Sequence, residues 1–190
     1  METDSGELAA RLVAAEHQAS RLMGLYVAAY QLHATLEPAE VRATIAEIAI
    51  NLLGAERFVL LLRAGTGEGC EIALAEGLEE DASGLFADGQ YVGADPMVDA
   101  TLEDGTLRVG PMGGSRALAA VPLVVQGTTV GALVILKLLD HKGGLVSHDR
   151  ELLELLAAHA ASALYAAQAH ANADRKLRTL ESLVKLARRA

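Results

Sequence analysis

The sequence predicts an α/β (α+β) fold: a central antiparallel sheet of five or six strands flanked by helices, with long N- and C-terminal helices. Three observations predict it. A strongly apolar hairpin lies at residues 117–139, shorter strand-like runs alternate with glycine-rich turns before it, and heptad patterns occupy both ends of the chain. We therefore expect an N-terminal helix at residues 1–35, a domain at 36–167 and an extension of the last helix at 168–190.

The central hairpin is the longest apolar stretch of the chain, ALAAVPLVVQGTTVGALVILKLL. Its polar middle, Gln126-Gly127-Thr128, predicts a short turn between two strands. This turn and Pro122 argue against a membrane-spanning helix, which needs an unbroken apolar run. Strands that are apolar on both faces are buried on both faces, so we expect these two strands at the centre of the sheet.

Local signals place the other elements. Proline in a first helical turn favours helix starts at Pro38 and after Asp95, which is expected to be an N-cap. The run 65–69 lacks the Lys-Ser/Thr of a phosphate loop and joins two strands, so it predicts a hairpin turn. The expected elements are helices at 6–35 and 38–53, strands at 57–63 and 71–76, a short helix to 102, a strand at 106–109, the hairpin, and a last helix from an N-cap at Ser147.

The hairpin and its flanks resemble the GAF domain family. The hairpin residues that carry the resemblance are Ala120-Val121-Pro122-Leu123, Gly127, Gly131 and Leu133. The helix and strand before the hairpin and the helix after it also occur in the family's order, so the resemblance spans roughly residues 36–167. It implies a sensory or regulatory module of signalling proteins, of the kind found in bacterial sensors.

Both ends of the chain carry heptad patterns. Apolar or small residues recur at alternating spacings of four and three from Leu8 to His33, and again from Leu152 to Ala187. Five heptads exceed what packing on one domain requires, so the sequence predicts that the two helices pair and form a coiled-coil homodimer. The expected dimer interface residues are Leu12, Ala19, Leu22, Tyr26, Leu156, His159, Ala163, Ala166, His170, Leu177, Leu180 and Val184.

Signals for catalysis, metals and cofactors are nearly absent. The chain has no Gly-x-Ser-x-Gly or His-Glu-x-x-His motif. Its single Cys70 lacks the further thiols that the family's free methionine sulfoxide reductases use. His159 and His170 share the last heptad seam and are either a metal or pH site or residues tolerated in a partly wet seam. We expect no catalytic residue, no metal and no cofactor.

The middle of the chain, residues 77–114, is expected to cover one face of the sheet, with the terminal helices and the helix from Pro38 on the other. Between residues 65 and 105 there are eleven acidic residues and no Lys or Arg, which disfavours phosphate ligands and nucleic acids. The family's cyclic-nucleotide string and bilin-binding Cys are also missing there. Candidates for any remaining ligand pocket, chosen by location, are Phe86, Tyr91, Met97, Asp99 and Arg108.

Taken together, these features predict a non-enzymatic GAF-type regulatory module that works as a homodimer and passes its output to a protein partner. The alternative is a small-molecule sensor whose ligand, bound under the middle loops, shifts the terminal helix bundle. The start of the sequence is acidic and lacks a basic and apolar leader, so we expect a cytoplasmic protein that contacts neither membrane nor nucleic acid.

Overall fold

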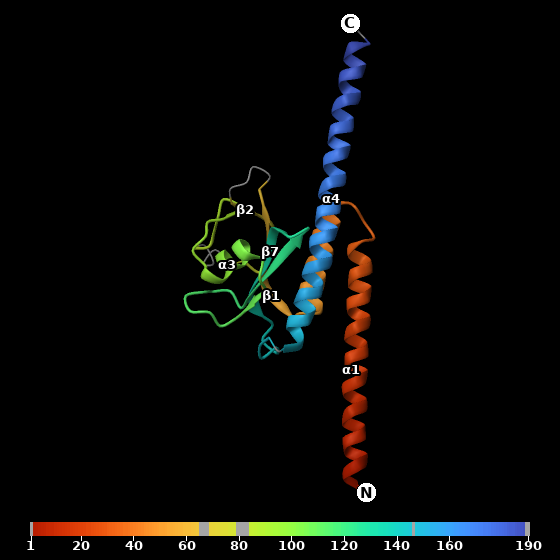
Figure 1. The fold of residues 1–190 in the computed structure, drawn as a ribbon, viewed down its shortest axis with the longest axis vertical. Coiled ribbons are helices and arrows are strands. Elements are labelled where there is room, and N and C mark those ends of the chain that lie inside the picture. The colour runs from red at the N-terminus through yellow and green to blue at the C-terminus, as the bar shows by residue number, and fades with distance from the viewer. Residues whose placement is uncertain (1, 65–68, 79–83, 146, 189–190) are drawn as a thin grey trace.

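The computed structural model describes residues 2–64, 69–78, 84–145 and 147–188 (Figure 1). It has the mixed α/β architecture expected from the sequence, with an antiparallel sheet and a long helix at each end. In chain order the elements are α1 (Glu2–Leu32), α2 (Pro38–Asn51), β1 (Ala55–Arg63), β2 (Cys70–Glu76), β3 (Phe86–Ala87), β4 (Gln90–Tyr91), α3 (Pro96–Asp104), β5 (Arg108–Val109), β6 (Ala119–Val125), β7 (Thr128–Leu138) and α4 (Ser147–Ala187).

The strands form one antiparallel sheet in the order β3-β4-β2-β1-β7-β6-β5. The predicted hairpin is confirmed: β6 and β7 are joined by Gln126 and Gly127, which both have positive φ, as the tight turn between antiparallel strands requires. The described residues give seven strands rather than five or six, because β3 and β4 form a two-residue pair around Asp88 and Gly89. Such a short pair leaves no alternating pattern in the sequence.

Each face of the sheet is covered by different elements. In β1, Phe58 and Leu60 point toward α2 and α4, whereas Val59 and Leu61 point toward α3, following the two-residue period of a strand. Figure 1 shows α4 on one side of the sheet and α3 with its loops on the other. Both faces are therefore closed by the chain itself, which agrees with the uniformly apolar hairpin.

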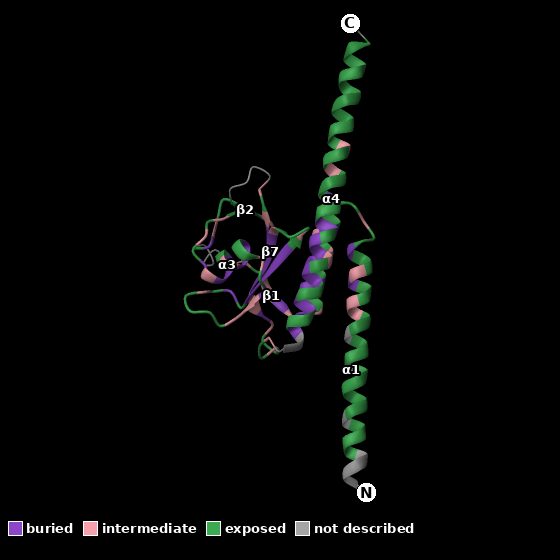
Figure 2. Ribbon diagram, viewed as in Figure 1, coloured by how far each residue is buried: buried purple, intermediate pink, exposed green. Residues whose placement is uncertain are grey.

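Helix α1 forms an outer layer, which corrects the expectation that it covers the sheet. It makes its main contacts with α4 and α2. Among the side chains of α1 that the structure describes, only Ala28 and Leu32 near its C-terminus are buried in the core (Figure 2). The two long helices lie side by side over a short stretch, so the start of α1 and the end of α4 project from opposite ends of the domain (Figure 1). They do not pair along their full heptad patterns.

Two expected local features fall outside what the structure describes. The expected hairpin turn at 65–69 joins β1 to β2, which pair antiparallel, but residues 65–68 lie outside the described residues. The last helix begins at Ser147 as expected, and the side chain that was expected to cap it is likewise not described.

Gly131 explains why the hairpin needs a glycine in its second strand. It lies in β7 between Leu62 of β1 and Leu123 of β6. A Cβ added at this position would overlap the carbonyl oxygen of Leu61, which is backbone and has no room to move. The glycine therefore allows the close approach of β1 and β7 at the centre of the sheet.

Replacing Gly131 with Ala is expected to lower the free energy of unfolding by more than about 2 kcal/mol, because the added methyl group forces two central strands apart. Chemical denaturation followed by circular dichroism measures the change. Gly113→Ala is the matched control, since nothing lies within 4 Å of a Cβ at that position. Equal stability of the two variants would contradict this account of the strand contact.

Candidate functional site

The sheet face beneath α3 is filled by side chains of the domain itself. Met97 and Val98 are 1% and 0% exposed and pack with Val59 and Val134 of the central strands. Leu85 and Leu102, two further residues that closure of this face requires, are also buried. Phe86 is half-buried and Val92 is exposed. The face where a small molecule was considered is thus occupied by the core.

Asp95 holds this layer in place. Its fully buried carboxylate accepts hydrogen bonds from the backbone N–H groups of Met97 and Val98 at 3.0 and 3.2 Å, which confirms it as the N-cap of α3. The same carboxylate accepts the hydroxyl of Ser115 at 2.8 Å and the N–H of Arg116 at 2.7 Å. It therefore ties the segment that leads into β6 to the start of α3.

The electrostatics of Asp95 agree with a structural role. Burial opposes its charged form, but the hydrogen bonds from Arg116, Ser115 and the start of α3 outweigh burial and lower the pKa of Asp95. The four hydrogen bonds on this buried carboxylate all come from the domain itself, three to Oδ1 and one to Oδ2. We infer that Asp95 fixes the segment before β6 against the start of α3.

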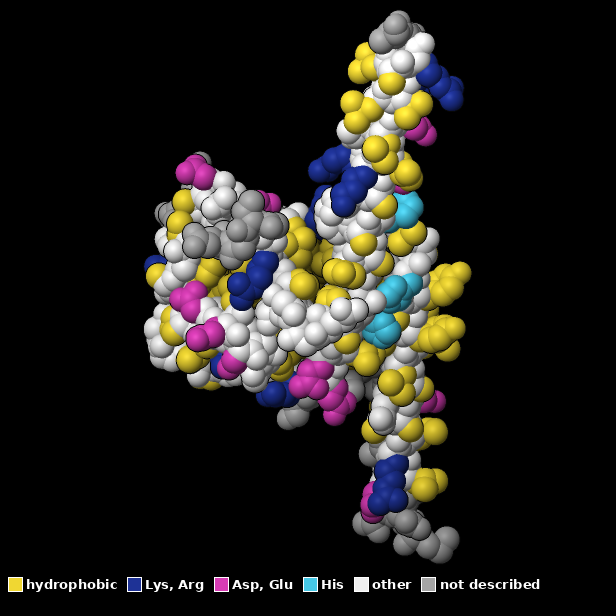
Figure 3. All heavy atoms as spheres, turned by 45° about the horizontal axis from the view of Figure 1, so that its top comes forward, with side chains coloured by type: hydrophobic (Ala, Val, Ile, Leu, Met, Phe, Trp, Pro, Cys, Tyr) yellow, Lys and Arg dark blue, Asp and Glu magenta, His cyan; other side chains and the backbone are white. Residues whose placement is uncertain are grey.

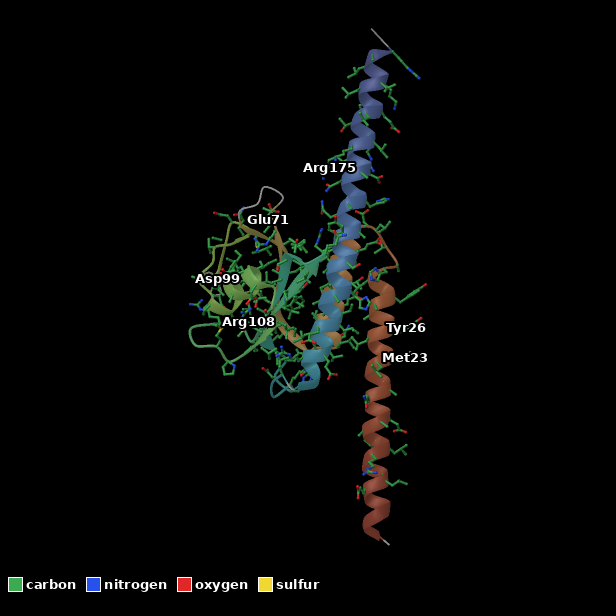
Figure 4. All side chains as sticks on the ribbon, in the orientation of Figure 1. Met23, Tyr26, Glu71, Asp99, Arg108 and Arg175 are labelled. Atoms are coloured by element: carbon green, nitrogen blue, oxygen red, sulfur yellow. The ribbon has the colours of Figure 1, made fainter. Side chains whose placement is uncertain are left out.

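The five candidate pocket residues lie in different parts of the domain. Tyr91 is on β4 and Arg108 on β5, with β2, β1, β7 and β6 between them in the sheet. Met97 is in the core, and Phe86 contacts the ring of Tyr91 at a centroid distance of 5.9 Å. Figure 4 shows Asp99 and Arg108 at separate positions around α3. The structure brings Phe86, Tyr91 and Asp99 together beside the apolar cluster that contains Met97, and it leaves Arg108 apart.

The polar candidates already have partners. The hydroxyl of Tyr91 donates to Oδ1 of Asp99 at 2.7 Å, and burial together with this carboxylate raises the pKa of Tyr91 well above its usual range. Arg108 donates from its guanidinium to Oδ1 of Asp104 at 2.8 Å, and this hydrogen bonding lowers the pKa of Asp104. Tyr91 and Arg108 are thus each hydrogen-bonded to a carboxylate of their own domain.

Asp95→Asn is expected to lower the free energy of unfolding by about 1–3 kcal/mol at neutral pH, because the new NH₂ group faces the N–H of Arg116. The lowered pKa sets the pH dependence. Stability from the carboxylate is present above the unfolded-state pKa of about 3.9 and is lost as pH falls through the folded-state value. Urea titrations from pH 7 to pH 3 should show the gap between the variant and the wild type closing. Asp88→Asn, in an exposed turn, is the control, and a pH-independent gap would contradict the role of the charge.

Most of the exposed large apolar side chains among the described residues lie on the two long helices. We call it the helix surface: the exposed large apolar residues of α1 and α4. Figure 3 shows apolar side chains gathered along both projecting helices, and Figure 4 places Met23 and Tyr26 on α1. These residues are Leu8, Leu12, Val13, Leu22, Met23, Tyr26, Val27 and Tyr30 on α1, and Leu155, Tyr165, Leu177, Leu180, Leu183, Val184 and Leu186 on α4.

A groove of about 640 Å³ runs between the two helices where they lie side by side. Its lining is apolar apart from two Tyr and two His side chains, and it is continuous with the helix surface. Its residues are Leu22, Leu25, Tyr26, Ala29, Tyr30, His33, Ala34, Leu155 and His159. Exposed apolar area of this extent is typical of a surface that another protein covers.

The expected dimer interface residues differ in how far they are exposed. Leu156 and Ala163 are 4% and 2% exposed and pack in the core of their own domain, which corrects their assignment to a surface for a partner. The first turns of α4 use those heptad positions to cover β6. His159 is half-buried, and the remaining expected residues are exposed: Leu12, Ala19, Leu22, Tyr26, Ala166, His170, Leu177, Leu180 and Val184.

The sequence grouped His159 with His170, but the structure places His159 beside His33. Nδ1 of His159 lies 3.4 Å from Nε2 of His33, at the junction of α4 and α1. His170 is farther along α4, with Nδ1 3.9 Å from Asp174. His33 and His159 both occupy heptad positions, but only the relative register of the two helices could reveal that they meet.

None of the described helices has a stretch long and apolar enough to cross a lipid bilayer. The thiol of Cys70 is buried, and burial raises the pKa of Cys70 even though the nearby charge of Arg63 lowers it. A buried thiol with a raised pKa is a poor nucleophile. The described residues therefore offer no activated cysteine.

A model of the GAF domain family matches residues 37–164. The chain is similar in structure to the GAF domain of a putative sensor histidine kinase from Pseudomonas syringae pv. tomato, with 20% identity and a TM-score of 0.57 over 92% of this chain and 97% of that one. It is similar to the GAF domain of an Acinetobacter phosphoenolpyruvate-protein phosphotransferase, with 11% identity and a TM-score of 0.65 over 80% and 98% of the two chains.

A further similar structure belongs to an enzyme, the type II free methionine-R-sulfoxide reductase from Thermoplasma acidophilum. The identity is 12% and the TM-score 0.50, over 67% of this chain and 91% of that one. A search of curated proteins gives no match. At these identities the solved structures show the fold alone, and the matching fold hosts both regulatory and enzymatic proteins.

Proposed function

This chain belongs to the GAF domain family, whose members are generally regulatory modules, and on that premise we propose that it is a non-enzymatic signalling module. It acts as a homodimer through the helix surface and passes its output to a protein partner. The observation that carries the proposal is the row of exposed apolar heptad residues on the projecting helices. Tyr26 is 71% exposed and Leu177 is 58% exposed, at positions where a coiled coil places buried side chains.

A second copy of this chain is the occupant that the charge pattern favours. Lys176 occupies the g position just before Leu177, and Glu181 occupies the e position just after Leu180. A parallel, in-register pair of α4 helices places Lys176 of one protomer beside Glu181 of the other. The same spacing recurs in α1, where Arg11 is at g and Glu16 at the following e. Both helices thus carry complementary charges for parallel self-association.

The two projecting segments support a two-fold arrangement of the same kind. A two-fold axis parallel to the helices sets α1 against α1 and α4 against α4, so each apolar row meets its own copy. The groove between α1 and α4 lies in the same surface and is covered in this arrangement. The helix surface is then buried without a change in the sheet.

Leu177→Glu combined with Leu180→Glu is expected to convert the dimer to a monomer without unfolding the domain, because both positions are exposed in the single chain. Sedimentation velocity at micromolar concentration measures the change, and Thr179→Glu, on the polar side of the same turn, is the matched control. A wild-type chain that already sediments as a monomer would refute the homodimer.

The charge pattern gives a test of orientation. Glu181→Lys is expected to weaken the dimer, since it sets Lys176 of one protomer beside a like charge on the other. Adding Lys176→Glu restores opposite signs and should restore association. An antiparallel dimer would show no such rescue. Leu156→Glu serves as a contrast, because it places a charge in the domain core and should unfold the protein rather than dissociate it.

The alternative function, a small-molecule sensor, differs from the proposed one because it requires a bound ligand. Because the face beneath α3 is filled, we expect native mass spectrometry of the purified protein to give the mass of the polypeptide without an added small molecule. Calorimetric titration with cyclic mono- and dinucleotides should release no heat, given the acidic stretch at 65–105. A tightly held molecule, or a micromolar dissociation constant for one of these nucleotides, would favour the sensor.

A further inference from the structure

A pair of imidazoles lies at the junction of α1 and α4, in the groove that the proposed dimer covers. Nδ1 of His159 and Nε2 of His33 are 3.4 Å apart, and the ring centroids are 5.7 Å apart at an interplanar angle of 75°. Figure 3 shows histidine side chains on the surface where the two long helices meet. We propose that His33 and His159 bind a divalent transition-metal ion of the Zn²⁺ class, which fastens the end of α1 to α4.

The distance between the two nitrogens fits a shared metal ion. In a tetrahedral site with Zn–N bonds of about 2.0–2.1 Å, two ligand nitrogens lie about 3.3–3.4 Å apart. Hydrogen bonds donated by N–H groups are usually shorter, with heavy-atom distances of about 2.7–3.2 Å. The observed separation is therefore long for a hydrogen bond and equals the edge of a tetrahedral coordination shell. Each ring has to rotate so that its lone pair points at an ion lying to the side of the line between the two nitrogens.

The surroundings of the pair accept a cation. Imidazole nitrogen is a preferred ligand of Zn²⁺, Cu²⁺ and Ni²⁺. The groove around the pair is lined by apolar residues with Tyr26 and Tyr30, and no Lys or Arg is among the described residues that line it. Within the described part of the chain no third His, Cys, Asp or Glu converges with these two. The protein thus supplies two ligands, and water occupies the remaining coordination positions.

The position of the site lets a bound ion join the end of α1 to α4. Helix α1 is anchored in the core through Ala28 and Leu32, and His33 follows directly after the second anchor. The metal joins this point to α4, 126 residues away in sequence. It thereby holds together the two helices whose projecting ends form the proposed dimer. The site is complete within one chain, so it does not depend on dimerisation.

Zn²⁺ titrated into the full chain after EDTA treatment and dialysis tests the proposal. Isothermal calorimetry is expected to give one ion per chain, and the Tm measured by circular dichroism is expected to rise with Zn²⁺. His33→Asn and His159→Asn should each weaken Zn²⁺ binding at least about tenfold, the smallest loss typical even for residues that only support a metal ligand. Titration with Co²⁺ adds a spectroscopic readout of nitrogen ligation.

The control is His170→Asn, which removes another exposed imidazole of α4 and should leave Zn²⁺ affinity unchanged. The proposal is overturned if the wild type binds no Zn²⁺, if neither His33→Asn nor His159→Asn weakens binding, or if His170→Asn abolishes it. The two variants alter different helices, so a folding defect in one leaves the other as a test. Sedimentation of the metal-free protein reports on the homodimer separately.

Discussion

The fold depends on a sheet whose central strands are apolar on both faces. In β6 the run Ala119–Leu123 is buried throughout, and the corresponding part of β7 is buried as well. Neither face can be left in water, so α2 and α4 close one and α3 with its loops closes the other. Once both layers are in place, the sheet has no open face left for another helix to cover. Helix α1 is therefore left outside, with most of its apolar residues exposed.

The same constraint divides α4 into two parts with different roles. Leu153 and Leu156 belong to the core against the sheet, whereas Leu177 and Leu180 project beyond the domain. The helix is continuous from Ser147 to Ala187, so a single element carries both the covered and the projecting part. This continuity connects the domain to the surface that we propose as its output.

Sequence reasoning reached the features that depend on local chemistry. The hairpin at 117–139 and the cap formed by Asp95 followed from turn residues and proline positions, and the structure confirms both. Sequence reasoning failed where the outcome depends on how one element is aligned with another in space. A heptad pattern is the same whether a helix faces its own sheet or a partner, so Leu156 was grouped with Leu177. The contact between His33 and His159 also depends on how far α1 slides along α4, which no local pattern encodes.

The packing of the α3 layer bears on how regulation can work. Opening a ligand cavity beneath α3 would expose Met97, Val98 and Leu102, and each buried side chain of this kind contributes about 1.5–3 kcal/mol. A ligand would have to offset several kilocalories per mole before any net affinity remained, and the Asp95 contacts would add to that cost. A shift of α1 on α4 changes mainly exposed contacts and two core residues. Movement of the helices is therefore the less costly change in this domain, and regulation through them needs no cavity in the sheet.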